Sequence, residues 1–322
     1  MLPSAALTNG PMALDLRPLT LPELLDRSFS TYRRHVWLFA GIMAVPGVFA
    51  MVYAVLMQFV QYWIGPLTPA GGPVDPNLAF QQMFLKVIPT LLLGLLFFAF
   101  YFVVYAFALG ATTIAVARIY GNQPIDVAGS YRDVRPHGGR LVLLMLWSGA
   151  RIGLVCLGLM VIVGLIVGMV GRLSPILSVM ILVSGVMVSL AVMVFFTVRY
   201  AVCVPAAVLE GLGPNRAIAR SVQLTRGYLG RIFLILLCAI VIAYATALLL
   251  QGPFMIVALF AGPGTVTALV FNVVAVVLGT AGSMFSGPIM IIGLAMAYYD
   301  LRIRKEALDL QMMFDSLDAP RA

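Results

Sequence analysis

The sequence has few charged residues, few histidines and few cysteines. Only 10% of its 322 residues are charged, and two are histidines, His35 and His137. Its three cysteines, Cys156, Cys203 and Cys238, lie in apolar runs without a CxxC motif. The sequence contains no HExxH zinc motif, no GxxxxGK[ST] phosphate loop and no GxSxG nucleophile motif. These absences argue against metal-dependent hydrolysis, ATP hydrolysis and serine-hydrolase chemistry. We therefore expect no enzyme, no cofactor and no metal site.

Apolar residues, by contrast, are abundant. They make up 62% of the chain, and the mean hydropathy is +1.05. A helix needs about 20 largely apolar residues to cross a bilayer. Six segments meet this requirement: 36–62, 88–117, 142–171, 175–208, 232–260 and 266–299. We expect an all-α polytopic membrane protein with six transmembrane helices in a single domain at 17–310, between tails at 1–16 and 311–322. Internal prolines are expected to kink the helices, because each removes a backbone donor; they are Pro46, Pro205, Pro253 and Pro288.

The basic residues alternate along the chain in step with the predicted spans. Lys86 and Arg172 fall in the connections of one side, and Arg151 lies inside a span. The other basic residues fall in the N-terminal segment, in the connections after the second and fourth predicted spans, and in the C-terminal tail. Arg199 is counted here with the connection after the fourth span. Cytoplasmic connections are the ones enriched in Lys and Arg, so both termini are expected in the cytoplasm. The same rule explains a pI near 9.7 without a nucleic-acid partner.

Three segments that precede predicted spans resemble one another. They read PELLDRSFSTYRR from Pro22, PIDVAGSYRDVRP from Pro124 and PNRAIARSVQLTR from Pro214. Each has a serine six or seven residues after the proline and an arginine five residues after the serine; these are Ser28 with Arg33, Ser130 with Arg135 and Ser221 with Arg226. We expect three pseudo-repeated hairpins (21–117, 123–208 and 213–300), each entered through a cytoplasmic amphipathic helix at the headgroup level.

Two arginines lie deep within predicted spans. Arg199 is about ten residues from the cytoplasmic end of its span, roughly 15 Å along a helix, and Arg151 is at a similar depth. A mid-bilayer arginine costs about 2.5–3.5 kcal/mol on insertion scales. In one interpretation both side chains extend to the cytoplasmic headgroups or pair with Glu210 or Asp300 at neighbouring span ends. In the other they line a polar cavity and hold a phosphate or carboxylate. Neutral polar residues such as Gln58, Gln251 and Asn272 are expected to bond between helices.

Three longer segments carry a family resemblance. LRPLTLPELLDRSFSTYRRHVWLF, VPAAVLEGLGPNRAIARSVQLTRGYLGRIF and YYDLRIRKEALDL resemble signatures of a bacterial multi-pass family, the membrane domain of glycerophosphoryl diester phosphodiesterases. The resemblance extends from about Leu16 to Leu310 and implies a bacterial cytoplasmic (inner) membrane location. In some members this membrane part precedes a catalytic barrel that needs histidine and paired acids, which this chain lacks. The resemblance therefore does not imply hydrolysis here.

The sequence leads to one preferred function and two alternatives. The preferred one is a non-enzymatic module that engages anionic membrane lipids or a partner protein at the cytoplasmic face. Its candidate anion-binding residues are Arg151 and Arg199 in the bundle and Arg33, Arg135 and Arg226 around it, because a guanidinium can bind phosphate through two hydrogen bonds. The alternatives are a transporter or permease subunit for a lipid or small anion, for which repeats and broken helices are typical, and a structural membrane anchor.

Overall fold

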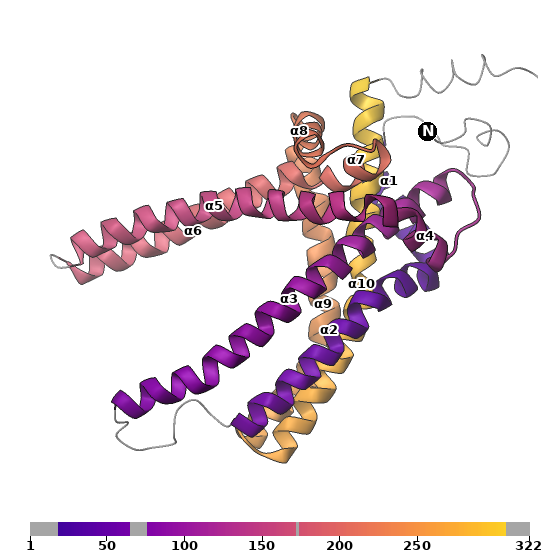
Figure 1. The fold of residues 1–322 in the computed structure, drawn as a ribbon. Coiled ribbons are helices and arrows are strands. Elements are labelled where there is room, and N and C mark those ends of the chain that lie inside the picture. The colour runs from indigo at the N-terminus through magenta and orange to yellow at the C-terminus, as the bar shows by residue number, and fades with distance from the viewer. Residues whose placement is uncertain (1–18, 65–75, 172–173, 307–322) are drawn as a thin grey trace, which may run out of the picture.

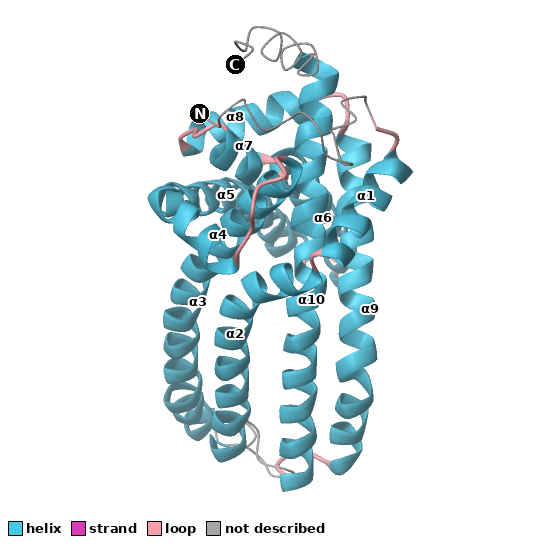
Figure 2. Cartoon of the chain, turned by 90° about the vertical axis from the view of Figure 1, so that its right-hand side faces the viewer, coloured by secondary structure: helices cyan, strands magenta, loops and turns pink. Residues whose placement is uncertain are grey.

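The computed structural model describes residues 19–64, 76–171 and 174–306, and within these ranges the chain forms helices and turns without strands (Figure 2). Six helices are long and apolar enough to cross a membrane, which confirms the predicted number. They are α2 (Val36–Ile64), α3 (Pro76–Tyr120), α5 (Gly138–Val170), α6 (Pro175–Tyr200), α9 (Leu229–Ala261) and α10 (Val266–Glu306). The predicted tails at 1–16 and 311–322 lie outside the described residues.

Short helices lie between the long ones. They are α1 (Leu21–Arg34), α4 (Val127–Val134), the 3-10 turn η2 (Arg135–His137), α7 (Cys203–Leu209) and α8 (Pro214–Thr225). Local sequence explains how α1 begins. The Thr20 hydroxyl accepts from the Glu23 amide, and the Glu23 carboxylate accepts from the Thr20 amide, which forms a capping box. Pro22 stands in the first turn, where a missing amide proton costs nothing.

The predicted span 175–208 agrees with the apolar segment Pro175–Leu209. It is interrupted where α6 ends at Tyr200 and α7 begins at Cys203. The predicted kink at Pro205 accounts for this break, because the proline ring clashes with the carbonyl group four residues earlier, at Ala201. At Pro46, Pro253 and Pro288 the helix continues through the proline. The predicted span 88–117 agrees with the apolar segment Val87–Tyr120, but the helix α3 itself begins earlier, at Pro76. A proline fits the first turn of a helix, and neither glycine nor a second proline follows it until Pro89.

The long helices do not form one parallel bundle (Figure 1). Helix α9 packs along α10, and α2 packs against α10 and α3. Helices α5 and α6 pack along each other and leave the rest of the molecule together, pointing away from α2, α9 and α10 (Figure 1). Large apolar side chains such as Leu157, Met169 and Met180 are exposed on this α5–α6 pair. These surfaces are suited to lipid and not to water.

The hydrophobic core lies at one end of the long helices, where the short helices pack across them. It includes Leu24 of α1, Phe39 of α2, Val116 of α3, Leu224 of α8 and Tyr298 of α10, each at most 1% exposed. Three of the short helices also bury a serine in this core, namely Ser28, Ser130 and Ser221. Ser28 donates to the Leu24 carbonyl and also contacts Met296 Sδ of α10 at 3.1 Å, whereas Ser130 donates to the Asp126 carbonyl at the start of its own helix. Ser221 donates to the carbonyl of Arg199 in α6. The short helices therefore hold the long ones together at this end.

Close packing at this end predicts a specific effect of adding a methyl group. A Cβ at Gly110 in α3 would lie 2.6 Å from Leu141 Cδ1 and 2.9 Å from Val134 Cγ2, and both neighbours are buried. Overpacking of this kind costs about 1–3 kcal/mol, so Gly110→Ala should lower the unfolding temperature in detergent. Gly153→Ala in α5 is the matched control, because nothing lies within 4 Å of its added Cβ and alanine favours a helix. Equal effects of the two changes would contradict this packing.

Candidate anion-binding face and cavities

The arginines named below lie at the end of the molecule where the short helices pack, which we call the basic end. Helices α2, α5 and α9 begin there, and α3, α6 and α10 end there. The opposite end, where α9 turns into α10, we call the far end. Within the described residues, the basic end contains two groups of linked charges, a separate ion pair between Arg118 and Asp133, and a set of exposed, unpaired arginines.

The first group of charges centres on Asp300 of α10, which is 2% exposed. Its Oδ2 atom pairs with Arg304 Nε at 3.0 Å and with Arg231 Nη2 at 3.2 Å. Its Oδ1 atom accepts from the Leu19 amide at 2.9 Å, while both guanidinium groups donate to the Leu19 carbonyl. One buried carboxylate thus fixes the start of α9, the end of α10 and the segment that leads into α1.

The second group links α7, α8 and α10. Arg220 Nε lies 3.0 Å from both carboxylate oxygens of Glu210, and its Nη1 atom pairs with Glu306. Arg302 Nε lies 3.1 Å from Glu306 and 3.9 Å from Glu210, which closes a ring of alternating charge. The Tyr298 hydroxyl donates to Glu210 at 2.5 Å. The hydrogen bond to Glu306, and then those to Glu210, raise the pKa of the Arg220 guanidinium above its ordinary value.

Both predicted acidic partners are therefore engaged, but with other arginines. The sequence suggested that Glu210 or Asp300 could pair with Arg151 or Arg199. In the structure Glu210 pairs with Arg220 and Arg302, and Asp300 pairs with Arg231 and Arg304. The partners of Asp300 come from the first turn of α9 and the last turn of α10, which helix packing brings together.

Arg199 lies closer to the end of its helix than the sequence suggested. It is the penultimate residue of α6, because the helix stops at Tyr200. Its carbonyl accepts from Ser221 at 2.9 Å and from Thr225 at 3.3 Å, so it stands level with α8. Its half-buried guanidinium lies over the Phe195 ring, with 5.6 Å from Cζ to the ring centroid. This placement favours the interpretation that Arg199 belongs to the basic end, and it argues against an arginine isolated in the middle of the bilayer.

Arg151 of α5 also reaches the level of α8. Its Nη2 atom donates to Asn215 Oδ1 at 3.0 Å, and its Cζ atom lies 5.5 Å from the centroid of the Trp147 ring. Arg140, eleven residues earlier on α5, donates to the Gly211 carbonyl at 3.3 Å. The two α5 arginines thus bind the turn before α8 and its first residues. Neither Arg151 nor Arg199 lines the two cavities described below.

The three repeated arginines are exposed at the ends of three short helices. Arg33 lies in the last turn of α1, while Arg135 and Arg226 follow the last residues of α4 and α8. Including their neighbours, the exposed arginines whose side chains form neither an ion pair nor a hydrogen bond within the described ranges are Arg33, Arg34, Arg132, Arg135, Arg216 and Arg226. We call this set the basic face. The short helices also expose two unpaired acids, Asp26 and Asp126, so the basic face has excess positive charge.

A cavity of about 380 Å³ lies beside α8 at the basic end. It is lined by Glu210, Leu212, Arg216, Ala219, Arg220 and Gln223. Arg216 is the one member of the basic face that lines it, and the two other charges in its wall, Glu210 and Arg220, bind each other. The free charge at this cavity is thus positive.

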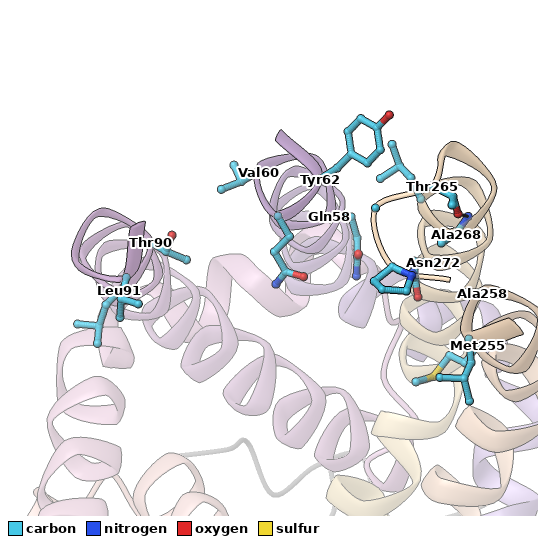
Figure 3. Close-up of a pocket in the computed structure, with 16 residues that line it drawn as sticks. Gln58, Val60, Tyr62, Thr90, Leu91, Met255, Ala258, Thr265, Ala268 and Asn272 are labelled. Atoms are coloured by element: carbon cyan, nitrogen blue, oxygen red, sulfur yellow. Dashed lines mark hydrogen bonds between the residues drawn. The ribbon is translucent and has the colours of Figure 1, made fainter. Parts of the chain in front are cut away.

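A larger cavity, of about 1030 Å³, lies at the far end between α2, α3, α9 and α10 (Figure 3). Its wall contains the amides of Gln58, Gln61 and Asn272 together with Thr90 and Thr265. Gln58 and Asn272 were expected to bond between helices, but no such bond links either amide to another described residue. Nothing in the sequence marks this site, because Asn272 lies more than 200 positions after Gln58 and Gln61.

No family model matches the chain, and neither a curated protein nor a solved structure shows significant similarity to it. The resemblance to the membrane domain of glycerophosphoryl diester phosphodiesterases thus stays a prediction.

Removing the charge of Asp300 should destabilise the protein. Asp300→Asn would leave Arg231 and Arg304 without their carboxylate, and breaking a buried ion pair costs about 3–5 kcal/mol. We expect a marked fall in the unfolding temperature of the purified protein. Asp126→Asn is the control, because Asp126 is exposed and its side chain makes no capping hydrogen bond. If both variants unfold at the same temperature, Asp300 does not have the role described.

Proposed function

We propose that the protein is a non-enzymatic, multi-pass protein of a bacterial cytoplasmic membrane whose basic face binds anionic lipid headgroups. The observation that carries this proposal is the excess of exposed, unpaired arginines on the short helices at one end of the long apolar helices. In a folded domain with few charges, arginines left without acidic partners are available to an external anion. The membrane supplies such anions at the depth where the short helices are expected to lie.

The orientation is part of the proposal. Basic residues are retained on the cytoplasmic side of a membrane, so the basic end faces the cytoplasm. The contact between Leu19 and Asp300 supports both termini on this side, because it joins the segment before α1 to the last turns of α10. The resemblance to the bacterial membrane-domain family supports the same location and adds no catalytic activity.

A threefold repeat is also proposed. Helices α1, α4 and α8 each bury a serine and expose an arginine five residues later, and each is followed by a pair of long helices. This agreement between sequence register and burial supports three amphipathic helices at the headgroup level. Such a repeat gives Arg33, Arg135 and Arg226 equivalent positions at the ends of their helices, where each can bind one phosphate.

The chemistry of arginine suits this role. A guanidinium stays charged and can donate two parallel hydrogen bonds to one phosphate group. A basic residue near an anionic membrane surface contributes about 1 kcal/mol of attraction. Arg151 and Arg199 stand level with α8. Their charges add to the positive electrostatic potential there, and this effect needs no direct contact with the headgroup.

A transporter or permease subunit is the second candidate, and the cavity at the far end is the observation that favours it. Transport needs a polar path from that cavity to the basic end. Thr246 and Thr280 lie between the two ends, and their hydroxyl groups donate to carbonyls of their own helices. They therefore offer little to a passing solute, and we rank transport below headgroup binding. A simple structural anchor is the third candidate.

Lipid retention tests the proposed function. We expect the protein purified in mild detergent to retain phosphatidylglycerol or cardiolipin in preference to phosphatidylcholine, as measured by native mass spectrometry. The triple variant Arg33→Gln, Arg135→Gln and Arg226→Gln should weaken this binding about 100-fold, because it removes about 3 kcal/mol of attraction.

The matched control for this experiment is the triple variant with lysine at the same three positions, which keeps the charge. It should retain most of the preference for anionic lipid. Unselective lipid retention in the wild type would contradict headgroup binding and direct attention to a protein partner. Unchanged retention of anionic lipid in the glutamine variant would show that the three arginines do not form the binding site.

A further inference from the structure

The far-end cavity has walls from four helices that the chain brings together from distant positions. Figure 3 shows Gln58 and Tyr62 from α2, Thr90 and Leu91 from α3, and residues of α9 and α10 around one space. The cavity lies where α2 and α9 end and α10 begins, so the length of the long helices separates it from the basic face. Its volume of about 1030 Å³ is at the upper limit of ordinary ligand pockets, roughly 300–1,000 Å³.

The polar groups of this cavity include three neutral amides, those of Gln58, Gln61 and Asn272. Gln58 and Asn272 are half-buried, and Gln61 is exposed. Their side chains form no hydrogen bond with other residues of the described ranges. An amide can both donate and accept hydrogen bonds. These side chains are therefore available to an occupant that does both.

The remaining wall of the cavity determines what else this occupant must be. None of the described lining residues is an aspartate, glutamate, lysine or arginine, so a charged headgroup would find no counter-charge among them. Apolar side chains form a large part of the wall, and they include Val60, Leu91, Met255, Leu259 and Leu269. Filling such a volume with water alone would require about thirty molecules against a largely apolar surface.

We propose that the far-end cavity binds a neutral lipid whose head carries hydroxyl groups. The amides of Gln58 and Asn272 bond the hydroxyl groups, since an amide offers both a donor and an acceptor. The hydrocarbon chain lies along Leu91, Met255 and Leu259. A diacylglycerol and a glycosylated diacylglycerol share this chemistry. This site is independent of the basic face, because the two select opposite kinds of headgroup at opposite ends of the molecule.

Photolabelling of the full-length protein in phosphatidylcholine nanodiscs tests this proposal. Three diazirine-bearing probes are used in parallel: a diacylglycerol, a monoglucosyl diacylglycerol and a phosphatidylglycerol. We expect the neutral probes to label peptides that contain the ends of α2 and α9 or the starts of α3 and α10. The relative labelling by the first two probes distinguishes a single hydroxyl group from a sugar. Cavity labelling by phosphatidylglycerol equal to that by both neutral probes would overturn the proposal, and so would the absence of neutral-probe labelling there.

Variants test which residues hold the probe. Gln58→Leu and Asn272→Leu should each reduce cavity labelling about fivefold, the effect expected from one neutral hydrogen bond. Ala268→Phe, at a buried position in the wall, should abolish labelling by filling the space. Gln251→Leu is the matched control, because it removes an amide of α9 that does not line the cavity. Equal labelling in all four variants would overturn the assignment.

Failure of this proposal can be distinguished from failure of the proposed function. The glutamine variant at Arg33, Arg135 and Arg226 should leave neutral-lipid labelling unchanged, because its changes lie at the other end of the molecule. Conversely, Asn272→Leu should leave retention of anionic lipid unchanged. If either substitution altered both measurements, the two sites would not be independent.

Discussion

The free-energy cost of removing a charge from water is the constraint on which the rest of this structure depends. In hydrocarbon a guanidinium or carboxylate must be paired or must extend to the polar surface. Asp300 and Glu210 satisfy the first condition, since each binds two arginines. The exposed arginines of α1, α4 and α8 satisfy the second. The same charges that keep this end polar also join the helices, because the partners of each acid come from different elements.

The two ends of the molecule therefore differ in chemistry as well as in position. The basic end combines a packed apolar core, buried serines and ion pairs beneath an excess of arginine. The far end has a large cavity with amides and with no charge among its described lining residues. A protein that selects anionic headgroups at one surface and a neutral lipid at the other would distinguish lipids by charge between the two faces of a membrane. This asymmetry connects the proposed function with the further inference.

Much of the fold could be predicted from sequence, because hydropathy and helix length act locally. The six spans follow from apolar runs, and the short helices follow from the Pro, Ser and Arg register. The break at Ala201–Val202 agrees with the kink predicted at Pro205, because the effect of a proline on the preceding turn is local. The pairings of Asp300 and Glu210 could not be predicted, because the choice among many nearby arginines depends on how α8, α9 and α10 pack. The far-end cavity could not be predicted either, since an unpaired amide is recognised only when its neighbours in space are known.

The central claim is that the arginine-bearing short helices all lie at the cytoplasmic surface, with the cavity end on the other side. Labelling with a membrane-impermeant maleimide tests it most directly, in a background where Cys156, Cys203 and Cys238 are replaced by alanine. Single cysteines are placed by Arg33→Cys, Arg135→Cys, Arg226→Cys and, at the far end, Thr267→Cys. We predict that the cysteines at positions 33, 135 and 226 are labelled only in inverted vesicles. The cysteine at position 267 should be labelled only in spheroplasts. Labelling of any of the three arginine positions from outside spheroplasts would contradict the account.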